Sequence, residues 1–472
     1  MTNRREFLRN SIGLTAAATI STTAISGCSN IKKDTKFANF LPDKPKPWVN
    51  WAGNEFCYPK SIKSPSTEDE ISEVLKQAKG QVRAVGSGHS FSPVVPTNDT
   101  LLSTDLLTGL ISHNDESKQA TLWAGTRIHD AGPMLDEVGQ AFINLPDMDY
   151  PSLAGAVVNS VHGTGTSFGS MSSYVTGLNL ITPQGDILEC HRNKNSDIFQ
   201  AAKTSIGSLG VISQLTFSNV ESFNLTEVTE MADVYHVLDD IDQHFENNRN
   251  FELFAIPLTS RCAIVKTNIA KPEDKNYGED DAGLLDDLKL LYKTVGNLPL
   301  IGQSMYQGIV SGLEPSNGKV TCRTGSSYKI LAHQRLTRFR EMEYTVPVEA
   351  GPACLKEILS TIKNKKLPMN FPIEYRHVKQ DDIWLSMFEG QTGASISVHQ
   401  FADWDYKSVF SHIEPIFWKY SGRPHWGKIH TLSYKQLASL YPRHWQDFSE
   451  IRQQLDPQGK MLNSHLKKVF IL

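Results

Sequence analysis

The stretch from Val82 to Pro93 reads VRAVGSGHSFSP and decides how the first part of the chain folds. Alternating small and apolar residues lead into Gly86-Ser87-Gly88, which predicts a strand that ends in a tight turn with exposed backbone N–H groups. Successive N–H groups of this kind form a concavity that can bind a pyrophosphate. Phe91 takes the place of the third glycine of a Rossmann turn, and Pro93 prevents a helix from starting there. The simplest alternative is a glycine turn beside a core histidine, His89.

Two more glycine turns follow, and each lies beside a β-branched stretch. The first is Val161–Gly169, which comes shortly after Ser152–Ala156, and the second is Ile206–Ile212. Three such turns suit one elongated cofactor that lies across several loops.

With these motifs the chain resembles the FAD-linked oxidases of the vanillyl-alcohol-oxidase superfamily, in particular the branch of aldonolactone oxidases and alditol oxidase. The resemblance implies an α+β, two-domain FAD-binding fold of the PCMH type, with a cap domain built on an antiparallel sheet. It spans nearly the whole mature chain. The matching motifs are Asn50–Asn54, Gly86–Phe91, Ser152–Gly155, His162–Gly165, Glu341–Tyr344, His425–Lys428 and Asp456–Lys460.

The pattern of the chain changes near residue 221, where we expect the first domain to end. Before it, helical spacing at Ser66–Ala78 and Asp130–Val138 is interleaved with short β-rich runs such as Gln119–Trp123. After it, Asp233–Asn247 predicts a helix with Asp233 as its N-cap, and a polar acidic loop at Lys271–Asp287 is expected to be solvated, not a metal site. We expect a signal peptide (1–27), a tether (28–47), an FAD-binding domain (48–221), a cap or substrate domain (222–424) and a C-terminal segment returning to the FAD-binding domain (425–472).

The N-terminus carries the paired arginines Arg4-Arg5, followed by a weakly apolar stretch that is too short and too polar for a membrane span. This pattern predicts a signal peptide read by the twin-arginine export machinery, with an ordinary secretory signal as the alternative. Ile25–Cys28 resembles a lipobox, in which Cys28 would be acylated; a chance cysteine near a cleavage site is the alternative. We therefore expect a periplasmic protein attached to a bacterial membrane only by lipid.

The composition narrows the range of partners and bound ions. The chain has 472 residues and a formal net charge of −4, so it lacks the basic surface of a nucleic-acid-binding protein. Apart from Cys28, its five cysteines are widely spaced without a C-x-x-C pair, which argues against a zinc site. One disulfide remains possible in an oxidising compartment, and the sequence does not select the pair.

The resemblance implies that His89 is bonded to the 8α-methyl carbon of FAD, because neutral imidazole is a good nucleophile near pH 7. The alternative is tightly bound, non-covalent FAD with His89 as a hydrogen-bond donor. The expected cofactor-binding residues are Gly86, Ser87, Gly88, His89, Ser90, Pro146, Ser152, Gly155, His162, Gly163, Thr164, Gly165, Gly210, Val211, Ile212, His425 and Lys428.

Glu374 and Arg376 are two residues apart in a strand-like run, so their side chains share one face. Alone, this spacing is typical of a surface ion pair. The resemblance instead places both over the flavin, where they position a substrate hydroxyl. It adds Lys428, whose ammonium would stabilise negative charge on the reduced ring; a solvated lysine is the alternative. Glu374, Arg376 and Lys428 are the expected catalytic residues.

Two positions bear on the substrate. Asp147 falls where alditol oxidase has a substrate-contacting serine, and a negative charge there is expected to disfavour anionic sugars. Its neighbour Pro146 falls beside the flavin, at a position that affects oxygen access in relatives. Gln400 is a further candidate for substrate contact, from its position alone.

The expected activity is oxidation of a CH–OH group of a sugar-derived polyol or aldonolactone, with hydride passing to flavin N5. Reduced flavin then passes electrons to O2 or another acceptor. The alternatives are a flavin dehydrogenase that feeds a quinone or cytochrome, and a flavin-carrying binding lipoprotein without turnover.

Overall fold

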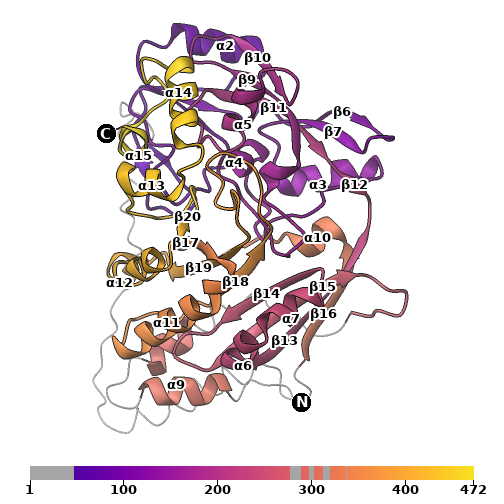
Figure 1. The fold of residues 1–472 in the computed structure, drawn as a ribbon, viewed down its shortest axis with the longest axis vertical. Coiled ribbons are helices and arrows are strands. Elements are labelled where there is room, and N and C mark those ends of the chain that lie inside the picture. The colour runs from indigo at the N-terminus through magenta and orange to yellow at the C-terminus, as the bar shows by residue number, and fades with distance from the viewer. Residues whose placement is uncertain (1–46, 277–288, 297–301, 312–318, 336, 472) are drawn as a thin grey trace, which may run out of the picture.

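A computed structural model describes residues 47–276, 289–296, 302–311, 319–335 and 337–471, which fold into two halves (Figure 1). The expected signal peptide, most of the tether and Cys28 lie outside the described residues, as does most of the expected acidic loop. No helix among the described residues is long and apolar enough to cross a membrane.

The upper half in Figure 1 alternates short strands and helices around two main sheets. Its elements are β1 (Trp48–Val49), β2 (Phe56–Cys57), β3 (Ser61–Lys63), α2 (Glu68–Gln77), β4 (Val82–Val85), β5 (Thr100–Ser103), β6 (Leu110–Asn114), β7 (Gln119–Trp123), α3 (Ile128–Glu137), β8 (Gln140–Ala141), α4 (Leu153–Val158), β9 (Val175–Ile181), β10 (Ile187–His191), α5 (Ser196–Ala202), β11 (Val211–Ser218) and β12 (Val220–Glu221). A five-stranded antiparallel sheet has the order β10-β9-β11-β7-β6, and a three-stranded parallel sheet has the order β3-β5-β4.

The lower half is one eight-stranded antiparallel sheet with helices on its outer face. Its elements are β13 (Asn224–Asp233), α6 (Val234–Asp239), α7 (Ile241–Glu246), β14 (Asn250–Ala255), β15 (Arg261–Ile269), α9 (Gly302–Ser311), β16 (Lys319–Ser326), α10 (Ser327–Leu331), β17 (Phe339–Pro347), α11 (Gly351–Asn364), β18 (Ile373–Val378), β19 (Gly393–Phe401), α12 (Tyr406–Lys419) and β20 (Arg423–Pro424). The strand order is β16-β13-β15-β14-β18-β19-β17-β20. The helices α6, α7, α11 and α12 pack on this sheet, so its other face is left for the site.

Local sequence signals explain several of these boundaries. Thr67 caps α2 by accepting a hydrogen bond from the N–H of Glu70, and β7 coincides with the predicted strand. Asp233 caps α6 as predicted, because its carboxylate accepts from two N–H groups of the first turn. The single helix expected over 233–247 is wrong in one respect: the chain breaks at Asp240 into α6 and α7.

The C-terminal helices return to the upper half and are tied to it by Arg83. They are α13 (Tyr434–Leu440), α14 (Trp445–Leu455) and α15 (Ser464–Phe470). The buried Arg83 guanidinium donates to the carbonyls of Ile206 and Gly207 and, from the last segment, of Met461. Beside it, the N–H of Val82 donates to the carbonyl of Lys460. One buried side chain therefore joins β4, a glycine turn and the C-terminus.

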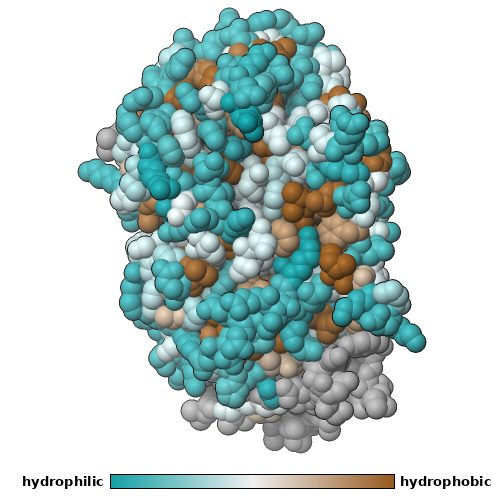
Figure 2. Space-filling view, turned by 45° about the vertical axis from the view of Figure 1, so that its right-hand side comes forward, coloured by the Kyte–Doolittle hydropathy of each residue, from teal (hydrophilic) through white to brown (hydrophobic). Residues whose placement is uncertain are grey.

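The predicted α+β fold, with an antiparallel sheet in the second half, is confirmed. The disulfide that the sequence left open is not formed, since none of the five cysteines in the described part of the chain is bridged. A cluster of apolar side chains lies at mid-height on the right of the face in Figure 2, at the level where the two halves meet.

Candidate active site

A cavity of about 940 Å³ lies between the glycine turns of the upper half and the inner face of the eight-stranded sheet. Fifteen of the seventeen expected cofactor-binding residues line it, together with Glu374, Arg376 and Asp147. The two that do not line it are Gly163 and Gly165. The three separated turns of the sequence therefore meet at one cavity, as expected for a single elongated ligand.

The glycines of the first turn allow the chain to pack closely around this cavity. A Cβ on Gly86 would collide with the hydroxyl of Ser152, the residue that caps α4. Gly88 has a φ of +65°, which disfavours other residues. Gly163 lies behind the cavity wall and lets the chain pack against the backbone of Leu145, because a Cβ on Gly163 would collide with the Leu145 carbonyl. Gly165, with a φ of +123°, donates its N–H to the carbonyl of His377.

His89 presents an imidazole to the cavity wall. Both ring nitrogens are buried, and neither has a hydrogen-bond partner among the described residues. The ring lies 4.5 Å from that of Trp51, centroid to centroid. Burial, aided by the charge of Lys428, lowers the pKa of His89 to about 3, so the ring is neutral. An orphaned, neutral nitrogen pair on a cavity wall fits a ligand that supplies the missing contact.

Glu374 and Arg376 form the expected pair, and it is buried. Their carboxylate and guanidinium lie 3.1 Å apart on β18, and the guanidinium also lies 3.6 Å from Glu343. Burial raises the pKa of Glu374 to about 8, although Arg376 acts in the opposite direction. One oxygen of Glu374 has no hydrogen-bond partner among the residues that the structure describes. The alternative of a surface ion pair is excluded, and this oxygen is open to a ligand.

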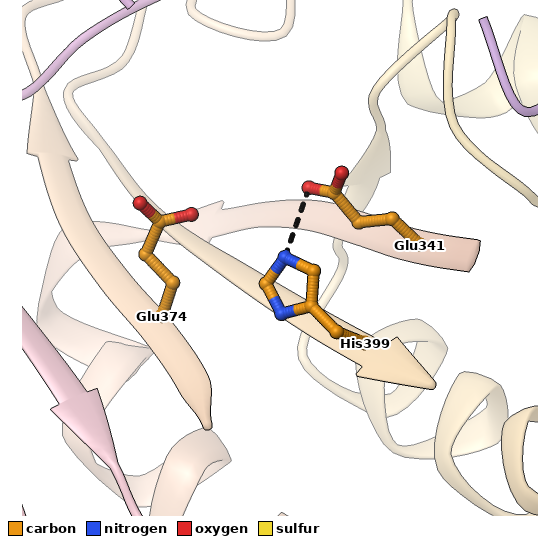
Figure 3. Close-up of side chains that lie close together, drawn as sticks. All are labelled: Glu341, Glu374 and His399. Atoms are coloured by element: carbon orange, nitrogen blue, oxygen red, sulfur yellow. Dashed lines mark ion pairs between the residues drawn. The ribbon is translucent and has the colours of Figure 1, made fainter. Parts of the chain in front are cut away.

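Lys428 belongs to a second buried pair, with Glu341 of β17. Burial opposes ionisation of Glu341, but the charge of Lys428, joined by that of His399 when its ring is protonated, outweighs it and holds the pKa of Glu341 well below the ordinary value. Figure 3 shows Nε2 of His399 facing a carboxylate oxygen of Glu341 at 3.5 Å, a contact that is an ion pair when the ring is protonated, with Glu374 turned toward them. These three side chains offer metal-ligand atoms within 4.8 Å of one another. Lys428 lies against Glu341 and Arg376 against Glu374, so the cluster is a network of charged and polar side chains that contact one another.

Asp147 lines the cavity, but its charge is not free. Arg335 binds both carboxylate oxygens at 2.9–3.1 Å, and Nδ1 of His333 lies 2.7 Å from one of them. Burial raises the pKa of Asp147, but these two groups outweigh it and lower that pKa far below its ordinary range. The expected repulsion of anionic sugars by Asp147 is therefore corrected: a bidentate guanidinium cancels the charge.

Gln400 does not reach the cavity, so the expectation of a substrate contact there is wrong. Its amide nitrogen donates to the carbonyl of Pro368 at 2.9 Å, and its oxygen accepts from the N–H of Phe401 at 3.1 Å. Successive side chains of a strand point to opposite faces. On β19 the cavity face belongs to the neighbouring His399.

Sequence reasoning gave no role to several cavity residues: Glu252, Arg335, Glu341, Glu343 and His399. Glu341 and Glu343 stand two apart in β17 and alternate with Met342 and Tyr344. This spacing was an available signal, since a carboxylate in a buried strand needs a partner. Glu343 accepts from Nε2 of His162 at 2.6 Å. Nothing in the local sequence pairs Arg335 with Asp147, because the two residues meet only through the fold.

Comparisons with known proteins agree with this geometry. Residues 215–469 match the D-arabinono-1,4-lactone oxidase family, and residues 59–191 match an FAD binding domain. An L-gulono-1,4-lactone dehydrogenase of Mycobacterium tuberculosis (strain H37Rv) is 32% identical over 433 residues, covering 89% of this chain and 98% of that protein. The L-gulonolactone oxidase of Bos taurus is 30% identical, covering 89% and 97%.

The crystal structure of cholesterol oxidase from B. sterolicum superposes with a TM-score of 0.74, over 92% of this chain and 98% of that one. At 16% identity this likeness shows the fold alone. The orphaned His89 nitrogens and the tight turn at Gly86 fit FAD as the cofactor. The chain therefore belongs to the D-arabinono-1,4-lactone oxidase family and is an FAD-dependent oxidoreductase.

Proposed function

We propose that the protein oxidises a ring hydroxyl of an aldono-1,4-lactone. The observation that carries this proposal is the buried Glu374–Arg376 pair on the cavity that Lys428 also lines, with one carboxyl oxygen of Glu374 left without a partner in the described part of the chain. The names of the relatives, which refer to L-gulono-1,4-lactone and D-arabinono-1,4-lactone, supply the substrate class. A sugar-derived polyol would be oxidised by the same reaction, because it carries the same CH–OH group.

Oxidation of a C–OH group removes a hydride from carbon and a proton from oxygen, and FAD supplies the hydride acceptor. Arg376 is a fixed donor toward the hydroxyl oxygen, where negative charge develops as the proton leaves. Glu374 holds a proton near neutral pH, so its carboxyl both donates and accepts hydrogen bonds. Together they would orient the hydroxyl for reaction.

His399 is placed to take the proton. Its Nδ1 lies 3.1 Å from the carbonyl of Pro372, which can only accept, so Nδ1 carries a hydrogen. The proton taken from substrate would therefore be held at Nε2. A positive charge on that ring is stabilised by Glu341, 3.5 Å away.

The test is anaerobic bleaching of the flavin spectrum with aldono-1,4-lactones, set against open-chain alditols and free aldoses. We expect bleaching by one or more lactones at rates well above those of the aldoses. Bleaching by alditols alone would replace the lactone with a polyol as the substrate class. A flavin that none of these compounds reduces would refute the activity and favour a flavin-carrying binding protein.

We further propose that FAD is bonded covalently to His89 through its 8α-methyl carbon. The support is the neutral ring with two unpartnered nitrogens in the loop that resembles the attachment site of the family. After acid precipitation the yellow colour should stay with the protein pellet. Release of all the flavin into the supernatant would refute the bond and leave His89 as a hydrogen-bond donor.

The relatives differ in the electron acceptor that their names imply, because one is named a dehydrogenase and another an oxidase. We propose that Pro146, on the cavity wall, restricts the approach of O2, so that another acceptor, such as a quinone or a cytochrome, carries most turnover. Dye reduction should then exceed O2 consumption, and Pro146→Gly should raise O2 consumption. Rapid O2 consumption by the wild type would overturn this proposal.

We also propose that the protein is exported folded to the periplasm by the twin-arginine machinery and anchored to the membrane through Cys28. The support is the sequence around Arg4-Arg5 and at Ile25–Cys28. Arg4→Lys/Arg5→Lys should trap folded protein in the cytoplasm, and Cys28→Ser should release it from membranes. Normal export of the double-lysine variant would contradict the route.

A further inference from the structure

Glu252 is a carboxyl group on the cavity wall that the proposed chemistry does not use. It lies on β14 with its side chain half-buried at the cavity surface. It makes no hydrogen bond or ion pair with the described part of the chain, whereas its neighbours Glu227 and Glu374 are paired with Arg323 and Arg376. A half-buried carboxyl that contacts no partner among the described residues is free to bind a ligand that enters the cavity.

The strand register places Glu252 next to the reacting centre. Phe254 of β14 lies opposite Glu374 of β18, and Leu253 lies opposite Tyr375. Continuing this antiparallel pairing by one residue sets Glu252 beside Arg376, one strand away, at a spacing of about 4.8 Å. A ligand held by Arg376 therefore has Glu252 as its next polar neighbour along the sheet.

The wall beyond Glu252 carries two hydroxyl groups, those of Thr229 and Thr321. Glu252 lies opposite Val265 of β15, which in turn lies opposite Thr229 of β13, and Thr229 faces Thr321 of β16. All four side chains line the cavity. Burial raises the pKa of Glu252 to about 7, although Arg376 acts against the shift; Asp147 and Glu227 add to it and Arg335 opposes it. Near neutral pH the protonated fraction both donates and accepts hydrogen bonds, as a hydroxyl does.

We propose that Glu252 binds the hydroxyl-bearing arm that projects from the lactone ring and so sets the preference for arm length. This inference rests on the proposed oxidation of aldono-1,4-lactones, in which Glu374 and Arg376 hold the ring hydroxyl. The arm would run from Arg376 past Glu252 toward Thr229. Glu252 is then a specificity-determining residue and takes no part in the bond-breaking step.

The experiment compares three lactones that differ only in the arm: a hexono-1,4-lactone, a pentono-1,4-lactone and a tetrono-1,4-lactone, the last without an arm. Glu252→Leu removes both hydrogen-bonding functions, and Glu252→Gln keeps a donor and an acceptor. For Glu252→Leu we expect kcat/KM to fall about tenfold or more with the hexonolactone, through KM, and to stay unchanged with the tetronolactone. Glu252→Gln should recover most of the loss.

The control variant is Thr267→Val, a change of similar volume on the same face of β15, one pair of residues away from Glu252. It should leave the ranking of the three lactones as it is in the wild type. Equal losses with all three lactones in Glu252→Leu would make the residue structural and overturn the proposal, and so would no loss with any of them. If no lactone reduces wild-type flavin, the proposed function itself fails, which is a separate and visible outcome.

Discussion

Replacing Lys428 with methionine removes the charge that pairs with Glu341 and leaves a buried carboxylate with His399 as its remaining partner. Removing one member of a buried ion pair costs about 3–5 kcal/mol of folding free energy. The Lys428 side chain is 16% exposed and that of Glu341 is 4% exposed, so we expect a value near the lower end, about 3 kcal/mol. The same change should slow flavin reduction by about 10²–10³, the usual effect of losing one preorganised charged group.

The double variant Lys428→Met/Glu341→Gln separates the two effects. Replacing both members of a buried pair by neutral groups is close to neutral for stability, so most of the lost folding free energy should return. The rate of flavin reduction should not return, because the ammonium is still missing. Glu341→Gln alone keeps the ammonium and should reduce flavin faster than the double variant.

Urea unfolding gives the stability, and stopped-flow reduction of the FAD-loaded enzyme at saturating lactone gives the rate. The reasoning is refuted if the double variant reduces flavin at nearly the wild-type rate. Lys428 would then serve only to neutralise Glu341, and its assignment as a catalytic residue would fail.

Three further outcomes are expected. The carboxyl of Glu374 keeps its proton up to about pH 8 in the folded protein but ionises near 4.5 when unfolded, so stability should fall as pH rises through this range; Glu374→Gln should flatten that fall in urea titrations. Gly163→Ala should destabilise by about 1–3 kcal/mol, because the added methyl group meets the Leu145 carbonyl, and an unchanged urea midpoint would contradict this. Arg335→Met should weaken inhibition by an aldonate more than inhibition by its neutral lactone, because Asp147 keeps its charge; equal changes in the two inhibition constants would count against the bidentate pair.

The parts of the site that could be predicted from the sequence are those set by local geometry. Two glycines around Ser87 permit a tight turn, in which Gly88 adopts a positive φ, and Glu374 and Arg376 share a face in any strand. His89 lines the cavity, as its position directly after Gly88 in that turn predicts. In each case neighbouring residues in the sequence determine the backbone shape, so a motif is enough.

The parts that could not be predicted depend on the tertiary fold. Arg335 and Asp147 are 188 residues apart, and their bidentate contact exists because a segment after α10 packs on a loop of the upper half. The predicted substrate contact of Gln400 was wrong because neighbouring residues of a strand point to opposite faces of the sheet. On this strand the side chain of His399 faces the cavity. The resemblance to known oxidases identifies the strand that lines the site, but it does not determine which of two neighbouring residues faces the cavity.

The contacts of Arg83 also bear on synthesis of the protein. Because its guanidinium and the adjoining Val82 amide bind carbonyls at Met461 and Lys460, the surroundings of the first glycine turn are completed only after residue 461 has been synthesised. Pairing across such a separation makes folding slow, because a long loop must close first. The nascent chain therefore lacks finished surroundings for this turn until residue 461 has been synthesised, and a chain truncated before it would leave the buried arginine without the carbonyl of Met461, although those of Val94, Ile206 and Gly207 would remain.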